Sequence, residues 1–131
     1  MPWRQTKGLA VSLAGEPVAK ARGETMITEE AAITGTPEED FRVEMLVSEG
    51  ETVAQGAPLL RDRRHPEIQE TAPMPGRVAA VTLGPGRRLI EIHLFLEHSA
   101  GRQEHDVEAA AQEDHALRKL LMTTGLWRRI R

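Results

Sequence analysis

The stretch from Val47 to Val78 constrains the fold more than any other part of the chain, because turn-forming residues recur in it every few positions. Gly50, Gly56 and Gly76 can supply positive φ at little steric cost, so each can reverse or bend the chain. Prolines in the same stretch cannot donate a hydrogen bond to a central strand ladder. We therefore predict short strands between tight corners, in a small and strongly bent β-structure.

Apolar and polar residues alternate in several other segments, as expected for strands with one buried face. The clearest example is 89–96, and the other strands that we predict are 9–13, 26–35, 41–47 and 78–83. The segment 26–35 also allows the start of a helix, although its β-branched residues favour extended structure. The side chains that we expect in the core are Val43, Val78, Ile90, Ile92 and Leu94.

Beyond Ser99 the period of the apolar residues changes. Residues 99–106 form a polar linker, and Asp106 is a suitable N-cap. We predict one main helix from about Ala110 to Thr124, with Gly125 as the glycine after its C-cap in a Schellman arrangement. This organisation predicts a β-module in residues 1–98, then a linker and C-terminal helix in residues 99–131, and the family resemblance described below implies that this segment leads toward a further domain.

Two sequence blocks in the turn-rich stretch resemble the biotinyl/lipoyl carrier domain. They are E-G-E-T-V-A-Q-G-A-P-L-L and A-P-M-P-G-R-V, separated by a short excursion. The resemblance implies a mainly β fold, a barrel-sandwich hybrid of two small sheets, here followed by a C-terminal α-helix. In carriers the excursion is a hairpin with a modifiable lysine at its tip. Here the tip reads R-R-H-P, and the lysines of the chain are Lys7, Lys20 and Lys119.

The chain as a whole resembles the N-terminal region of the A subunit of the Na⁺-translocating NADH:quinone oxidoreductase. The motifs K-G-L-A-V-S-L-A-G-E-P, D-R-R-H-P, A-P-M-P-G-R-V and L-L-M-T-T-G-L-W-R-R-I-R occur in the order of that family. The resemblance implies a non-catalytic module of a respiratory complex that couples NADH oxidation and quinone reduction to sodium export. It also implies a longer parent protein, because members of the family continue well beyond this length.

The same resemblance implies where cofactors and partners lie. NAD, ubiquinone, flavin and iron centres would belong to the rest of the complex, with none in this chain. The partners would be other subunits and the downstream domains. The module would sit on the cytoplasmic face of the inner (plasma) membrane, held there by partner subunits.

Two other interpretations stay open at this point. One is a stand-alone carrier-like domain that binds a protein partner and carries neither biotin nor lipoate. The other is the related β-module of the C subunit of the Rnf electron-transport complex. The coding sequence after Arg131 would separate the stand-alone domain from the reductase subunit, since a stop codon favours the former and a long continuation favours the latter.

Composition excludes several classes of function. The net charge of −3 gives no overall attraction to nucleic acid, and the presence of only four aromatic residues argues against a base-stacking surface. The chain has no cysteine, which rules out disulfides, thiolate catalysis and cysteine-held metal centres within it. No stretch approaches the ~20 apolar residues of a membrane-spanning helix.

We assign no catalytic, cofactor-binding or metal-binding residue. Glu91, His93 and Glu97 share a strand face, but their spacing spreads them over ~20 Å. Two groups of side chains are candidate contacts with a partner, one at the hairpin tip and one near the C-terminus. The alternative for the first group is a solvated hairpin tip, and the alternative for the second is a tryptophan folded onto the β-module. An exposed C-terminal group would also favour self-association. The candidates are Arg61, Arg63, Arg64 and His65 at the hairpin tip, and Leu126, Trp127 and Ile130 near the C-terminus.

The hairpin tip generates a prediction about modification. Neither arginine nor histidine forms the amide that attaches biotin or lipoate, so co-expression with either ligase is expected to leave the intact mass unchanged. A mass increase that matches one of these groups would contradict the assignment of the tip.

Overall fold

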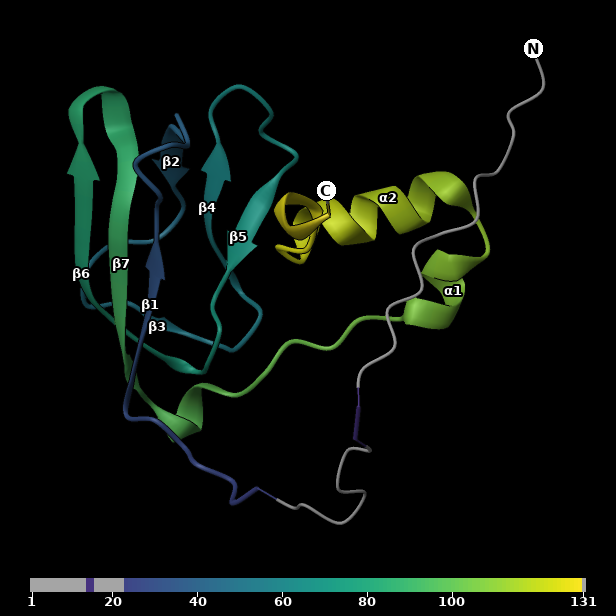
Figure 1. Cartoon of the computed structure of the whole chain (residues 1–131), viewed down its shortest axis with the longest axis horizontal. Helices are drawn as coiled ribbons and strands as arrows, with labels where there is room; N and C mark the ends of the chain where they lie inside the picture. Colours follow the sequence, from purple (N-terminus) through teal and green to yellow (C-terminus); the bar gives the residue numbers. More distant parts are fainter. Residues whose placement is uncertain (1–13, 16–22, 131) are drawn as a thin grey trace.

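The computed structural model describes residues 14–15 and 23–130, so the strand expected at 9–13 lies outside the described part (Figure 1). Strands dominate the described residues up to position 96, and short helices follow them. The strands are β1 (Glu30–Thr34), β2 (Val43–Met45), β3 (Thr52–Val53), β4 (Pro58–Asp62), β5 (Gln69–Thr71), β6 (Gly76–Gly84) and β7 (Arg88–Leu96). These bounds confirm the predicted strands around 78–83 and 89–96 and shorten those expected at 26–35 and 41–47.

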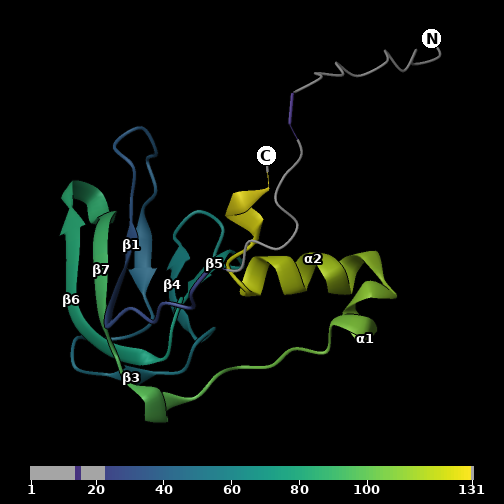
Figure 2. The same ribbon diagram turned by 60° about the horizontal axis from the view of Figure 1, so that its bottom comes forward.

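The strands form two antiparallel sheets. One sheet has the order β1-β7-β6-β3 and the other has the order β2-β4-β5. The long β6–β7 ribbon curves around the module, and the smaller sheet faces it (Figure 2). Strands β4 and β5 pair as a hairpin, and its tip carries Arg63, Arg64 and His65. The fold class is therefore confirmed, a mainly β barrel-sandwich hybrid followed by C-terminal helices.

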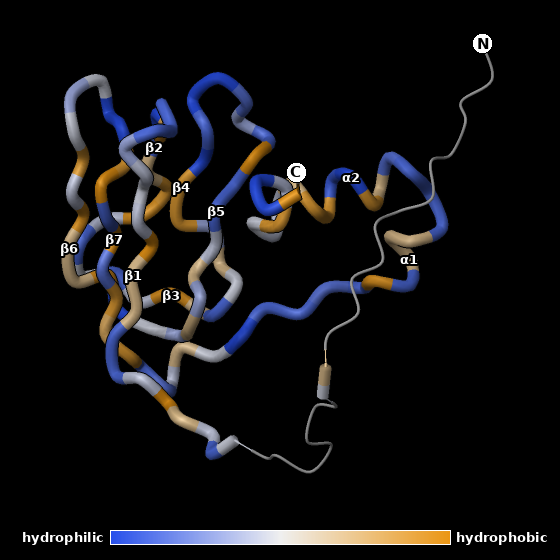
Figure 3. Tube along the Cα trace, in the orientation of Figure 1, coloured by the Kyte–Doolittle hydropathy of each residue, from blue (hydrophilic) through white to orange (hydrophobic). Residues whose placement is uncertain are grey.

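The hydrophobic core lies between the two sheets. Hydrophobic residues concentrate along the strands, while the β4–β5 tip and the linker after β7 are hydrophilic (Figure 3). Four of the five predicted core residues are buried, since Val43, Val78, Ile92 and Leu94 have no exposed surface. Leu59 and Leu60 join them from β4, and both are fully buried. The alternation pattern was thus correct for all but one of the five residues that it placed in the core.

The exception is Ile90, which is 42% exposed, so its prediction as a core residue is wrong. The β6–β7 pairing skips one residue here, because Thr82 is opposite Glu91 whereas Leu83 is opposite Leu89. A bulge of this kind inserts an extra residue into one strand and reverses the alternation of its side chains. Leu89, which is 2% exposed, takes the core position instead.

The predicted single C-terminal helix is two helices, α1 (Val107–Ala111) and α2 (Asp114–Thr123). Glu113 between them has extended backbone angles, which interrupt the helical hydrogen bonds. Neither glycine nor proline marks this break, so local sequence rules did not reveal it. The Asp106 cap is confirmed, because its side chain accepts a hydrogen bond from the N–H of Ala109 at 2.9 Å. Within residues 23–130, no helix has the length and apolar content to cross a membrane.

The end of α2 lies against β5. Gly125 follows the C-cap with φ +77°, and the N–H of Leu126 donates to the carbonyl of Leu121 at 3.2 Å, which confirms the Schellman arrangement. The Thr71 hydroxyl donates to the carbonyl of Thr124 at 3.2 Å. A Cβ on Gly125 would stand only 3.2 Å from that hydroxyl oxygen. A glycine at this position therefore serves both the helix end and its close approach to the sheet.

The bulge generates a matched pair of variants. Ile92→Ala is expected to lower the free energy of unfolding by ~2–5 kcal/mol, through lost burial and a residual cavity. Ile90→Ala removes the same atoms from a half-exposed position, so its loss is expected to stay below ~1.5 kcal/mol. Urea denaturation of both variants measures the difference. Equal losses would show that the bulge is misplaced.

Candidate functional site

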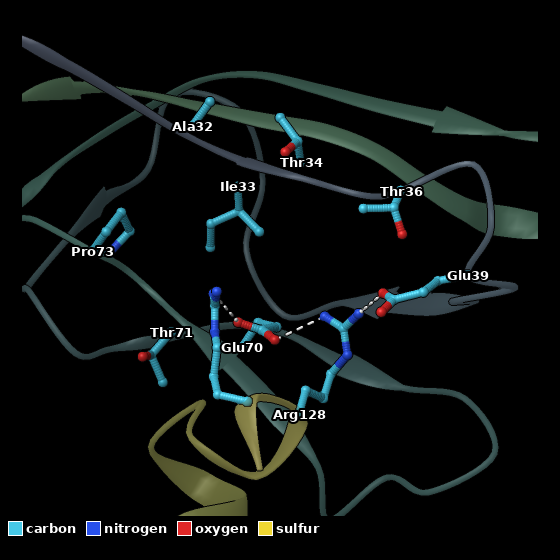
Figure 4. A pocket seen from close by; sticks show the side chains of 10 residues that line it. Ala32, Ile33, Thr34, Thr36, Glu39, Glu70, Thr71, Pro73 and Arg128 are labelled. Carbon is cyan, nitrogen blue, oxygen red and sulfur yellow. Dashed lines mark hydrogen bonds and ion pairs between the residues drawn. The ribbon is translucent and has the colours of Figure 1, made fainter. Parts of the chain in front are cut away.

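The short 3₁₀ turn η3 (Trp127–Arg129) brings a guanidinium onto the smaller sheet. Arg128 donates one hydrogen bond from Nη1 to Glu70 on β5 at 2.8 Å. It donates a second from Nη2 to Glu39, in the loop before β2, at 2.5 Å. Figure 4 shows the guanidinium between these two carboxylates. One side chain from the C-terminal segment thus connects two separate parts of the β-fold.

Glu70 is the buried member of this group, with a side chain that is 3% exposed. Among the described residues it is the one buried charged side chain. Burial of a carboxylate is unfavourable unless a cation and hydrogen bonds compensate it. Arg128 supplies the hydrogen-bonded cation, and Arg129 places Nη2 at 3.8 Å from the other carboxylate oxygen. The electrostatic balance inside the β-fold therefore depends on the C-terminal segment.

The same guanidinium stacks on an aromatic ring. Its central carbon lies 3.5 Å from the ring centroid of Phe41, which is itself buried. A flat cation over an aromatic face is attracted by the negative potential of the ring, most strongly where water is excluded. An arginine makes this stack and still binds two carboxylates, which a lysine ammonium does not reproduce. We call the group formed by Arg128, Glu70, Glu39 and Phe41 the Arg128 clasp.

A pocket of about 490 Å³ opens beside the Arg128 clasp. Its walls come from β1, β5, the loop before β2 and η3 (Figure 4). Its ionisable side chains are already engaged in the pairs just described. In the part of the chain that the structure describes, no three His, Asp or Glu side chains gather closely enough to hold a metal ion. His93 instead lies 3.0 Å from Glu30 across the β1–β7 pair.

The three C-terminal candidates lie next to the clasp. Leu126 is 52% exposed and Ile130 is 58% exposed, while Trp127 is half-buried in η3. The sequence identified this segment as important but not the residue that attaches it to the sheets, which is Arg128. Exposed apolar side chains on an anchored turn form a surface that a partner can cover.

The four hairpin candidates gather at a different place, at the tip of β4 and β5. Arg61 binds Glu44 at 2.9 Å, and Arg64 binds Asp40 at 2.9 Å. The Asp62 carboxylate accepts hydrogen bonds from the backbone N–H groups of Arg64 and His65, which shapes the turn. The tip is thus an ordered set of ion pairs on the surface.

The clasp residues were missed because their pairing joins distant parts of the chain. One local signal existed. Glu70 on β5 and Ala72 just after it are two residues apart and both buried, so they face the same inner side. A glutamate at an inward position of a short strand requires a partner. The sequence does not say which of the many arginines supplies it.

Comparison with known proteins gives a consistent result. Residues 4–97 match the family model described as the NqrA N-terminal barrel-sandwich hybrid domain. The A subunit of the Na(+)-translocating NADH-quinone reductase from Neisseria meningitidis serogroup A is 33% identical over 131 residues, which is 95% of this chain and 28% of that protein. The proteins of the same name from Actinobacillus succinogenes and Serratia proteamaculans are 33% and 32% identical, again over 95% of this chain. The chain spans 28–29% of the length of these curated relatives.

The Arg128 clasp generates a stability prediction. Arg128→Ala leaves Glu70 buried without its hydrogen-bonded cation, so the free energy of unfolding is expected to fall by ~3 kcal/mol or more. Arg129 is largely exposed and 3.8 Å from the carboxylate, so Arg129→Ala serves as the control and is expected to lose under ~1 kcal/mol. Chemical denaturation compares the two variants.

A second measurement isolates the clasp from general packing. Low millimolar guanidinium is expected to raise the melting temperature of the Arg128→Ala variant, because the ion fits between Glu70, Glu39 and Phe41. It should leave the Arg129→Ala variant unchanged. Equal destabilisation of the two variants, together with no rescue, would contradict the role assigned to the clasp.

Proposed function

Because the chain belongs to the family of NqrA N-terminal barrel-sandwich hybrid domains, we propose that it is a non-catalytic docking module within the A subunit of a Na⁺-translocating NADH-quinone reductase. The observation that carries the proposal is the family match over residues 4–97, on a carrier fold whose hairpin tip has no lysine. A scaffold of this kind has lost the group that carriers use for chemistry and keeps a rigid body with exposed loops. Such a body is suited to binding other parts of a complex.

In this role the module takes no part in redox chemistry, which would occur in other parts of the complex. NADH, flavin, ubiquinone and iron centres would be bound outside this chain, by downstream domains and partner subunits. The module would lie on the cytoplasmic side of the inner membrane, held through those subunits. The Arg128 clasp supports a structural role, since it joins the C-terminal segment to the loop before β2 and to β5.

The C-terminal segment would form the contact with the next part of the parent protein. We divide the chain for this purpose into the β-module, residues 1–98, and a connecting segment, residues 99–131. The clasp holds η3 against the sheets and leaves Leu126 and Ile130 exposed beside Trp127. Aromatic, aliphatic and arginine side chains concentrate binding energy in protein interfaces. This patch is therefore the proposed attachment site for the downstream domain or a partner subunit.

Affinity purification tests this function. The tagged chain, purified from membranes of its own cells, is expected to recover the other reductase subunits, identified by mass spectrometry. Leu126→Glu and Ile130→Glu are expected to lower this recovery, because a charge in an apolar contact must be desolvated. Val107→Glu is the matched control, since Val107 on α1 is 59% exposed and lies outside the patch.

The same variants give an independent readout on the isolated chain. If the patch is left uncovered, the isolated chain is expected to self-associate through it, and sedimentation should show less dimer for Ile130→Glu and Trp127→Ala. Recovery of no reductase subunit by the unmodified chain would overturn the proposed function. Equal loss of recovery for the patch variants and Val107→Glu would overturn the assignment of the patch.

A further inference from the structure

Three loops converge at one end of the β-fold, and Arg42 lies at their centre. Its carbonyl accepts a hydrogen bond from the N–H of Arg63 at the β4–β5 tip, at 3.0 Å. Its backbone bridges to Arg88 at the start of β7. Its guanidinium lies against the β6–β7 turn, where a Cβ on Gly86 would stand 3.0 Å from Nη1. The sequence-distant loops before β2, after β4 and after β6 are therefore neighbours.

Each of the three loops that meet here carries arginine side chains at or near its ends. We call the group the arginine end. Its members are Arg42, Arg61, Arg63, Arg64 and Arg87. All five of these side chains carry a guanidinium group. Guanidinium is a planar donor that matches a carboxylate with two parallel hydrogen bonds.

Carboxylates between the arginines fix their positions. Asp40 lies 3.0 Å from Arg42 and 2.9 Å from Arg64, so two arginines share one carboxylate. The hydrogen bond from Arg42 is the main reason that the pKa of Asp40 is below its ordinary value. The pKa of Glu44 is lowered in the same way. The residues that lower it are Arg61 through a hydrogen bond and charge, with further charge effects from Arg87 and Arg63.

The arginine end keeps a positive excess. Five guanidinium groups are set against the carboxylates of Asp40, Glu44 and Asp62, which leaves about two positive charges in excess. The chain as a whole has a net charge of −3, so the rest of the molecule is correspondingly acidic. A molecule with this charge separation orients an acidic partner toward one end as the two approach.

Arg87 adds an observation that does not depend on charge counting. Its φ is +61°, and it is the one non-glycine residue with positive φ in the described part of the chain. Side chains other than glycine are disfavoured in this conformation, which makes such positions candidates for function. The strained backbone allows Arg87 Nε to donate to the carbonyl of Val43 at 3.1 Å, which holds the side chain at this end of the fold. A glycine would suit the turn better, so the arginine is present for its side chain.

From this arrangement we infer that the arginine end is a docking surface for an acidic protein segment on a partner subunit. The inference rests on the proposed function and names the partner chemistry of a second face of the module, separate from the C-terminal patch. Fixed guanidinium groups with carboxylates between them suit a defined pattern of carboxylates. They suit an anionic lipid surface less well, because Asp40 and Glu44 would be pressed against its phosphates.

A fluorescent oligoglutamate peptide is the probe for this surface. Anisotropy is expected to show that the unmodified chain binds the peptide at low salt and releases it as salt is raised, because exposed charges are screened. Arg63→Gln is expected to weaken binding by on the order of fivefold, the effect of about one exposed charge contact. Arg102→Gln is the matched control, because Arg102 is exposed on the linker and away from the three loops. Its effect should be negligible.

Arg87→Gly gives a second variant with the fold preserved. Glycine accepts the positive φ, so the melting temperature of the variant should not fall. Its binding to the peptide should weaken, because the guanidinium of Arg87 is gone. Peptide binding that is unaffected by Arg63→Gln and Arg87→Gly would overturn the inference. Stronger Arg63-dependent binding to phosphatidylglycerol vesicles than to the peptide would overturn it in favour of a membrane surface.

The failure of this inference is distinguishable from the failure of the proposed function. If the reductase subunits are recovered with the unmodified chain and equally with Arg63→Gln, the function stands and the arginine end is not its docking surface. If the peptide binds in an Arg63-dependent way but no reductase subunit is recovered, the surface stands and the proposed function fails.

Discussion

The carboxylate of Glu70 is buried in a β-fold that would be easier to build with an apolar side chain at that position. Its compensating guanidinium comes from Arg128, 58 residues later in the chain. The same guanidinium contacts Glu39, 89 residues earlier, and stacks on Phe41. Each contact is satisfied only when the C-terminal turn lies on the smaller sheet. The position of that turn on the smaller sheet depends on this interaction, together with the hydrogen bond from Thr71 to Thr124.

Much of the fold was accessible from the sequence because its signals are local. Turn residues around Gly50, Gly56 and Gly76 predicted a small bent β-structure, and the carrier resemblance implied its two sheets. Alternation identified four of the eleven buried hydrophobic residues. The failures have a common physical cause. Ile90 and Leu89 are both apolar, so only the pairing of β7 with β6 decides which of them is buried. The break between α1 and α2 likewise has no glycine or proline to announce it.

The candidate binding surfaces could be predicted from the sequence only in part. The hairpin tip was visible as R-R-H-P, but Arg42 and Arg87 belong to the same surface only because separate loops meet in space. For the Arg128 clasp the sequence offered only the inward position of Glu70, and it did not identify Arg128 as the partner, because an ion pair between distant residues has no fixed spacing. Sequence patterns therefore identified segments of interest, whereas the assembled fold identified which side chains act together.

The separation between Arg128 and its partners has a consequence for synthesis. A ribosome that has completed β5 has made every residue of the smaller sheet, yet the cation for Glu70 is added only 58 residues after it. Until then the nascent sheet holds a carboxylate without its guanidinium partner, and the hydration that this carboxylate needs opposes close packing. We therefore expect the early module to remain loosely packed on the ribosome. The final tightening would wait for the arrival of the C-terminal turn, so emergence of a single arginine would mark the moment at which the domain becomes resistant to proteases.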